Sequence, residues 1–296
     1  MRGYVDALWP PVTAERLVAA VLGDRDLLAR AAAGVLTEQE PDDLAGGGAP
    51  GRWSRADLPL LDEASYLLER SSGYAHVVVD EAQDLSQMQL RAIGRRCVTG
   101  SATVLGDLAQ GTTPGAPGNW SDVLLHLGKP SGRLEVLNTG YRVPRQVLDL
   151  ANRLLPHIAP GIAPAASLRS APDSLELRRT SVLVVDAAAA VRERTGSGSV
   201  AVVAAGAALL TAAGEQLAAD GVGAELLGEG IPAGQVALVP ADLVKGLEFD
   251  SVVLLEPAAI ASRGQYGLRL LYVALTRAVS SLLVLHSEDL PRELAG

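Results

Sequence analysis

Aromatic residues and cysteine are scarce in this chain. Aromatic residues make up 3% of the 296 residues, and there is a single Phe. The hydrophobic share is nevertheless 48%, so the chain should fold around cores built from Ala, Val and Leu. The one cysteine, Cys97, cannot form an internal disulfide, which suits a reducing cytoplasm. We therefore expect a cytoplasmic protein without disulfides, long enough for two compact domains.

Long apolar runs and an excess of basic residues are also missing. No uncharged apolar run reaches about 18 residues, so we expect no membrane-spanning helix. Residues 1–10 carry charges and a Trp, unlike the apolar centre of a signal peptide. The net charge of −9 opposes binding to nucleic acid through many phosphate contacts. Binding to DNA should therefore be weak or indirect.

Hydrophobic patterning predicts strands that alternate with helices over most of the chain. Residues 11–40 and 56–69 are expected to be helical before this alternation begins. The alternation predicts an α/β fold with mostly parallel sheets. The expected strands are 77–79, 102–105, 133–138, 181–186, 199–204, 222–227, 235–239, 251–255 and 281–286. The expected helices are 86–98, 120–127, 143–155, 187–194, 206–219 and 266–279.

Two adjacent acids follow the first expected strand. The apolar run 77–79 leads directly into Asp80 and Glu81, and then into Gln83 and Asp84. Ligands bind at the carboxyl edge of parallel sheets, which is where these carboxylates would lie. One acid there can hold Mg²⁺ through its waters, and the other can activate an attacking water. The alternative is that the pair caps the next helix, but the flanking residues favour an ATPase.

A second transition from strand to loop, at residues 103–110, offers Asp107 and Gln110. An amide side chain can donate a hydrogen bond to a phosphate oxygen and accept one from water. It can therefore respond to the presence of the γ-phosphate of ATP. The alternative is an ordinary turn, because Gly-Asp is common in turns.

Two arginines lie further along the chain. Arg142 follows Tyr141, Arg277 lies in the run YVALTRA, and the run KGLEFD begins between them at Lys245. A guanidinium group is always charged and can stabilise the charge that develops at a γ-phosphate. A single arginine on a helix is more often solvated or paired with an acid. Two of them after a carboxylate pair suggest guanidinium groups presented across a cleft.

Taken in order, these segments resemble motifs II to VI of the UvrD/Rep-type superfamily 1 helicases. The runs that carry the resemblance are DEAQD, GDLAQ, YR, KGLEFD and YVALTRA, within residues 56–286. The resemblance implies two RecA-like (P-loop NTPase) domains with parallel sheets, the first of them incomplete, and ATP with Mg²⁺ in the cleft between them. The implied parts are a helical preamble with part of the first domain at 1–75, the rest of that domain at 76–133, and the second domain at 134–296.

The resemblance also implies a role for each motif residue. Asp80 would coordinate Mg²⁺, and Glu81 would activate water. Gln110 would report the γ-phosphate, while Arg142 and Arg277 would be the two arginine fingers. Glu248 would touch the nucleotide ribose or the neighbouring motor loop. The full cofactor-binding set would be Gln83, Asp107, Lys245, Gly246 and Glu248.

Further residues resemble one branch of that superfamily, the HelD-type proteins. These residues are the pair WS at 53–54, the run ADLPLLDE at 56–63, Trp120, and the run YRVP at 141–144. HelD-type proteins are helicase-like ATPases that bind bacterial RNA polymerase and help to remove it from nucleic acid. The resemblance therefore implies RNA polymerase as the partner. A fragment of a UvrD/Rep-type DNA helicase or translocase, and a degenerate adaptor that only binds a protein, are the alternatives.

The sequence departs from the family pattern in three places. No phosphate-binding loop of the form GxxxxGK[ST] occurs in it. We therefore expect a fragment whose missing N-terminal half carries this Walker A loop, or a truncated gene product, and no ATP hydrolysis by the chain alone. The loop 111–118 lacks the aromatic residues that stack on bases. Asp242 lies where the typical helicase has a His, and both changes weaken a DNA-unwinding interpretation.

Overall fold

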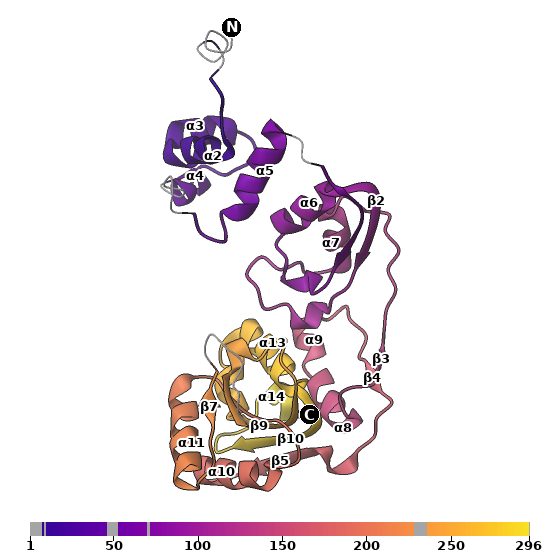
Figure 1. Ribbon diagram of the computed structural model, residues 1–296, viewed down its shortest axis with the longest axis vertical. Coiled ribbons are helices and arrows are strands. Elements are labelled where there is room, and N and C mark those ends of the chain that lie inside the picture. Colours follow the sequence, from indigo (N-terminus) through magenta and orange to yellow (C-terminus); the bar gives the residue numbers. More distant parts are fainter. Residues whose placement is uncertain (1–7, 9, 46–52, 70–71, 228–235, 296) are drawn as a thin grey trace. The chain divides into compact units, whose positions relative to one another are not determined.

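The computed structural model describes residues 8, 10–45, 53–69, 72–227 and 236–295 (Figure 1). Its contacts divide the chain into two compact units. The first unit comprises Met1–Gly106 and Thr113–Gly132, and the second comprises Asp107–Thr112 and Arg133–Gly296. The segment Asp107–Thr112 thus belongs to the second unit, although the chain on both sides of it belongs to the first.

The amino-terminal part of the first unit is helical. Asp24 ends one helix and begins the next, because its side chain accepts a hydrogen bond from the amide of Leu27. Gly34, with φ +78°, lies in the following turn. The continuous helix predicted for 11–40 is therefore wrong, since a cap and a turn divide it. The helices are α2 (Ala14–Gly23), α3 (Arg25–Ala31), α4 (Glu40–Leu44) and α5 (Leu58–Leu68).

Two parallel strands form the small sheet of the first unit. They are β1 (Tyr74–Val79) and β2 (Cys97–Val104), joined by α6 (Gln87–Arg95) and followed by α7 (Trp120–His126). Figure 1 shows α6 and α7 beside β2. The strand–helix–strand order agrees with the prediction, but the predicted burial of 77–79 is wrong for Val78. Tyr74 and Val78 lie on one face of β1 and are each 66% exposed, because no described element of this unit covers that face.

The second unit is built on a six-stranded sheet in which every pairing is parallel. The strand order is β5-β10-β9-β6-β8-β7. This sheet confirms the predicted α/β fold and is the arrangement expected of a RecA-like domain. Two further short parallel strands are β3 (Thr139–Gly140) and β4 (Ala166–Ser167). The six strands are β5 (Leu175–Arg179), β6 (Val200–Ala204), β7 (Glu225–Leu226), β8 (Val236–Pro240), β9 (Phe249–Leu255) and β10 (Ala278–His286).

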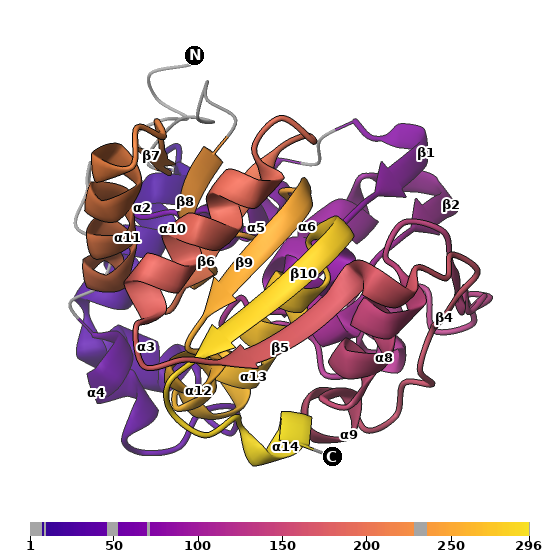
Figure 2. The same ribbon diagram turned by 90° about the horizontal axis from the view of Figure 1, so that it is seen from below.

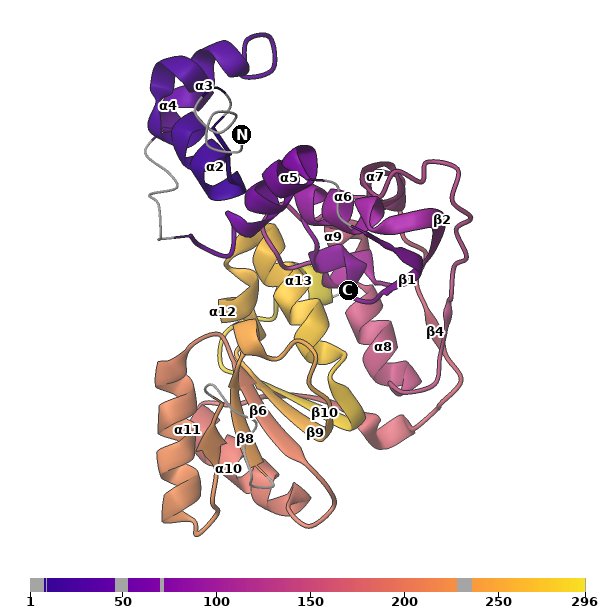
Figure 3. The same cartoon turned by 45° about the horizontal axis from the view of Figure 1, so that its top comes forward.

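Helices cover both faces of this sheet. Figures 2 and 3 show α10 and α11 on one side of it and α12 and α13 on the other. Side chains of β9 alternate accordingly, with Val252 and Leu254 in one core and Val253 and Leu255 in the other. No described helix is long and apolar enough to cross a membrane. The helices are α8 (Arg145–Asn152), α9 (Leu155–Ile158), α10 (Leu183–Arg194), α11 (Ala207–Ala219), α12 (Pro257–Ala261), α13 (Gly264–Leu275) and α14 (Arg292–Ala295).

Two of the predicted strands of this unit are wrong. Residues 133–138 have no regular structure, and Val136 and Leu137 are 68% and 87% exposed. The apolar run at 181–186 is mostly the start of α10, in which Val182 and Val185 face solvent at 52% and 53% exposure. The edge strand is instead the charged segment β5, which pairs with β10. The prediction from apolar runs therefore put the edge strand at 181–186, whereas the observed edge strand is β5.

Candidate functional site

Asp80 and Glu81 lie at the carboxyl end of β1, and both are exposed. Glu81 adopts the left-handed conformation, with φ 52° and ψ 39°, which costs of order 1 kcal/mol for a non-glycine residue. Its amide donates to Asp80 Oδ1 at 2.8 Å. Neither carboxylate caps the next helix, because Ser86 caps α6 and Glu81 makes no side-chain cap. The strained turn instead presents both acids at the tip of the strand.

Gln83 connects these acids to the next motif within the first unit. It lies in the 3₁₀ helix η1 (Ala82–Asp84), is fully buried, and donates from Nε2 to the carboxylate of Glu81. A Cβ placed on Gly106 would lie 2.5 Å from Gln83 Oε1. The glycine of the GDLAQ run is therefore required for close packing of the two motif loops. This contact gives Gln83 a positioning role beside Glu81.

The remainder of the GDLAQ run belongs to the second unit. Asp107 begins the 3₁₀ helix η2 (Leu108–Gln110), and its Oδ1 accepts a hydrogen bond from the amide of Ala109 at 3.0 Å. Its Oδ2 accepts from Gln110 Nε2 at 2.8 Å. Asp107 therefore fixes both the turn and the direction of the Gln110 amide.

Lys245 and Arg277 hold the other polar atoms of Gln110. The ammonium group of Lys245 donates to the backbone carbonyl of Gln110. The guanidinium of Arg277 donates to Gln110 Oε1 at 3.0 Å. With Asp107 on its Nε2, the Gln110 amide is thus bonded at both ends. Three of the motifs selected from the sequence meet at this one residue.

Arg277 is buried, with 4% of its surface exposed, and it follows the end of α13. It donates to the carbonyl of Val273 at 3.1 Å and to that of Leu247 at 3.4 Å, in addition to Gln110. Arg277 is therefore not solvated, which was the alternative weighed for a single arginine, and its predicted role as an arginine finger stays a prediction. Burial, and then the charge of Asp107, raise the pKa of the neighbouring Tyr272 well above its ordinary value. The positive charge of Arg277 opposes this rise in the pKa of Tyr272.

Arg142 is paired with Glu248 at the surface of the second unit. Each side chain is 46% exposed. Such pairs contribute about 0–1 kcal/mol, so Arg142 can exchange Glu248 for another anion at little cost. Arg169 supports the segment by donating to the carbonyl of Arg142 at 3.2 Å and to that of Val279 at 2.5 Å. Gly246, with φ +78°, forms the turn that places Lys245 and Glu248 on either side of it.

The structure therefore gathers the predicted residues into one group in each unit. Asp80, Glu81 and Gln83 form the group of the first unit, and the roles predicted for them stay predictions. The exposed carboxylate oxygens of Asp80 and Glu81 are the hard ligands that Mg²⁺ prefers, so this group fits a metal that keeps several waters. No cluster of three or more metal-ligating side chains occurs in the described part of the chain. The group of the second unit comprises Asp107, Gln110, Lys245, Gly246, Arg277, Arg142 and Glu248.

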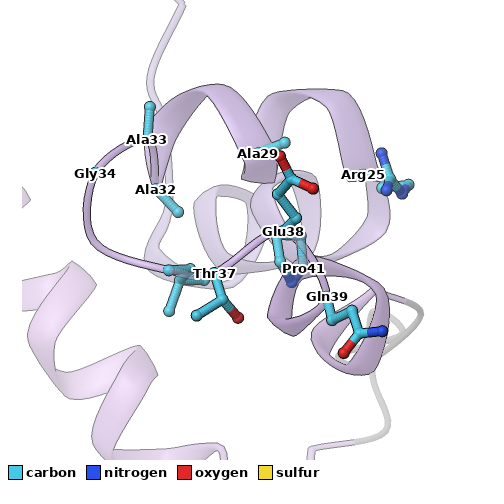
Figure 4. Close-up of a pocket in the computed structure, with 10 residues that line it drawn as sticks. Arg25, Ala29, Ala32, Ala33, Gly34, Thr37, Glu38, Gln39 and Pro41 are labelled. Atoms are coloured by element: carbon cyan, nitrogen blue, oxygen red, sulfur yellow. The ribbon is translucent and has the colours of Figure 1, made fainter.

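Arg269, which was not selected from the sequence, also holds the segment Asp107–Thr112, called the Gln110 segment below. Its guanidinium donates to the carbonyls of Leu108 at 3.2 Å and Gly111 at 2.8 Å. The available signal was weak: a second arginine on the helix about two turns before Arg277. A cavity of about 570 Å³ elsewhere, among α3, α4 and the turn between them, contains none of the predicted residues (Figure 4).

Comparison with known proteins gave similarities among solved structures alone. No family model matches the chain, and no curated protein matches it. The chain is similar to the C-terminal domain of a possible DNA helicase from Lactobacillus plantarum WCFS1, with 21% identity over 53% of this chain and 92% of that one, and a TM-score of 0.41. It is also similar to the Arterivirus nonstructural protein 10 helicase in complex with DNA, with 17% identity and a TM-score of 0.40. That match covers 73% of this chain but 41% of the viral protein.

Proposed function

We propose that this chain is the carboxyl-terminal portion of a HelD-like, helicase-related ATPase that binds bacterial RNA polymerase and helps to release or recycle it. ATP and Mg²⁺ would bind between two RecA-like domains in the protein that also carries a phosphate loop. The support comes from the order of the motifs in the sequence and from the contacts that three of them make.

The contacts of Gln110 carry this proposal. Lys245 and Arg277 are 135 and 167 residues away from Gln110 in the sequence, yet both donate to it. Each was selected for the same reaction from a different short motif. Unrelated short matches would have no reason to converge on one amide, so the convergence supports interpreting the motifs as parts of one nucleotide-handling machine.

The chemistry follows from what each side chain can donate or accept. Asp80 would hold Mg²⁺ through its waters, and Glu81 would take a proton from the attacking water. Gln110 would exchange its bond to Asp107 for a bond to a phosphate oxygen, which makes its orientation sensitive to the nucleotide. The guanidinium of Arg277 would supply positive charge to the γ-phosphate group of ATP.

The surroundings of Asp242 favour a protein partner over a DNA strand. Asp242 follows β8 in the 3₁₀ helix η4 (Ala241–Leu243). Arg263 donates to both of its oxygens, at 2.8 and 2.9 Å, and Tyr266 donates at 2.8 Å. The hydrogen bond from Arg263 lowers the pKa of Asp242, so the carboxylate is charged at neutral pH. Both oxygens of Asp242 are thus occupied by Arg263 and Tyr266, and an ionised carboxylate offers a phosphate group no hydrogen-bond donor where a typical helicase carries a His.

The test measures ATP hydrolysis and polymerase binding together. The chain is assayed alone, and then together with the polypeptide encoded by the DNA immediately upstream of its first codon, which the proposal requires to contain a phosphate loop. We expect no hydrolysis by the chain alone, and hydrolysis by the combination that single-stranded DNA does not stimulate. The combination should also bind core RNA polymerase in a pull-down with purified components.

Other results would contradict the proposal. Strong stimulation by single-stranded DNA without polymerase binding would identify a UvrD/Rep-type translocase. Polymerase binding without hydrolysis in any combination would identify an adaptor. Hydrolysis by the chain alone that disappears in Glu81→Gln would show that the expectation about the phosphate loop is wrong.

A further inference from the structure

The Gln110 segment is held by the second unit although the chain on both sides of it belongs to the first. Ala109 is fully buried in the core of the second unit. The carbonyls on both sides of it, from Leu108 and Gly111, accept hydrogen bonds from Arg269 of α13. The segment is thus anchored by one apolar side chain and by one guanidinium that spans it.

All three hydrogen bonds of the Arg269 side chain go to backbone carbonyl oxygens. Its third contact is a hydrogen bond from Nη2 to the carbonyl of Ile158 at 3.0 Å. Among the described residues it forms no ion pair with a carboxylate. Burial lowers its pKa, yet the ordinary pKa of arginine is so high that the group stays charged. Arg269 is partly buried, and its hydrogen bonds to the carbonyls at the two ends of η2 offset part of the cost of that burial.

We propose that Arg269 is a positioning residue that fastens the Gln110 segment to the second unit through its two carbonyls. The nucleotide-sensing amide is therefore mounted on the unit that carries Arg277, and not on the unit that carries Asp80 and Glu81. Arg269 does not touch the nucleotide; it acts through Gln110. The functional importance of this anchor rests on the proposed function, whereas its mechanical effect does not.

The shape of the guanidinium is essential to this proposal. One nitrogen, Nη1, reaches both Leu108 and Gly111, while Nη2 reaches Ile158, so the planar fork joins η2 to the end of α9. Lysine offers a single ammonium on a flexible stem and cannot hold these three carbonyls in the same geometry. Arg269→Lys should therefore retain the charge but lose part of the anchoring.

Amide hydrogen exchange in this chain tests the proposal without nucleotide. Arg269→Ala should accelerate exchange of the Gln110 and Gly111 amides by roughly tenfold or more, because two hydrogen bonds from a charged donor to the segment are lost. Exchange in β6 and β9 should stay unchanged. Arg269→Lys should give an intermediate acceleration. The matched control is Arg263→Ala, which removes an arginine beside the same helix that contacts Asp242 and not the segment.

Two outcomes would overturn the proposal. The first is unchanged exchange of Gln110 and Gly111 in Arg269→Ala. The second is acceleration throughout the second unit, which would show a general loss of stability and not a local anchor. Accelerated local exchange together with failure of every ATP hydrolysis assay would retain the anchor and refute the proposed function, so the two failures can be told apart.

Discussion

Replacing Arg277 by Met tests whether its buried guanidinium holds the second unit together around Gln110. Methionine has a similar length and fills the same space, but it donates no hydrogen bond. The substitution leaves the carbonyl of Val273 and the amide oxygen of Gln110 without their charged donor. The contact with Leu247 at 3.4 Å is long and contributes little.

The expected cost follows from these two contacts. A hydrogen bond to a charged group contributes about 1.5–3 kcal/mol, so two of them amount to about 3–6 kcal/mol. The methyl and thioether groups recover part of this by apolar burial, which leaves a destabilisation of about 3 kcal/mol. That is a large part of the 5–15 kcal/mol by which a typical domain is stable. The midpoint of urea unfolding should fall by roughly 1–2 M.

The chain contains a natural means of separating the two units in this assay. Trp53 and Trp120 lie in the first unit, and residues 133–296 contain no tryptophan. Tryptophan fluorescence therefore reports unfolding of the first unit, whereas far-ultraviolet circular dichroism is dominated by the larger second unit. Arg277→Met should shift the transition seen by circular dichroism and leave the fluorescence transition in place.

The control is Arg292→Ala, which removes an arginine whose side chain is 94% exposed. It should change stability by less than about 0.5 kcal/mol. The reasoning about Arg277 would be refuted by a circular dichroism midpoint that matches the control. It would also be refuted if the fluorescence transition shifted instead.

Three further predictions use the same two signals. Gly106→Ala should destabilise the first unit by about 1–3 kcal/mol in the fluorescence transition, because its Cβ would meet the buried Gln83 at 2.5 Å. Glu81→Gly relieves a left-handed strain of about 1 kcal/mol but removes the carboxylate that accepts from the buried Gln83 amide, a loss of about 1–3 kcal/mol, so that unit should lose up to about 2 kcal/mol; a gain in stability would contradict this. Asp242 has a lowered pKa in the folded state, so its contribution is present above its unfolded pKa of about 4 and is lost as the pH falls through the folded value. Arg263→Ala should remove this contribution of Asp242 to the pH dependence of stability, measured by circular dichroism of unfolding from neutral to acid pH. An unchanged pH profile would show that the pair of Arg263 and Asp242 does not contribute to stability.

The central strands of the second unit were predictable because burial on both faces requires unbroken apolar runs. The strands β6, β8, β9 and β10 each contain such a run, and each was expected within a few residues of its observed position. The strand β5 was not predictable in this way. Its sequence LELRR is charged because it lies at the edge of the sheet, and only pairing with β10 makes it a strand.

The members of the candidate groups were selected from the sequence and their roles stay predictions, whereas their arrangement could not be predicted from it. The motif order identified Gln110, Lys245 and Arg277, since the chemistry restricts the residue types at those positions. Nothing local to the GDLAQ run shows that Gly106 packs in one unit and Asp107 in the other, because that depends on contacts with distant segments. Arg269 was missed for the same reason: it binds backbone carbonyls, and these leave no trace in the sequence.

The measurement that tests the central claim most directly is ATP hydrolysis by the chain combined with the phosphate-loop-bearing polypeptide that the proposal requires, in two single variants. Glu81→Gln alters the first unit, and Arg277→Lys keeps the charge of the second unit but not the planar fork. If the two groups act on one ATP, each variant alone should lower the hydrolysis rate by roughly a hundredfold or more while nucleotide still binds. Hydrolysis at the unaltered rate in either variant would contradict the claim.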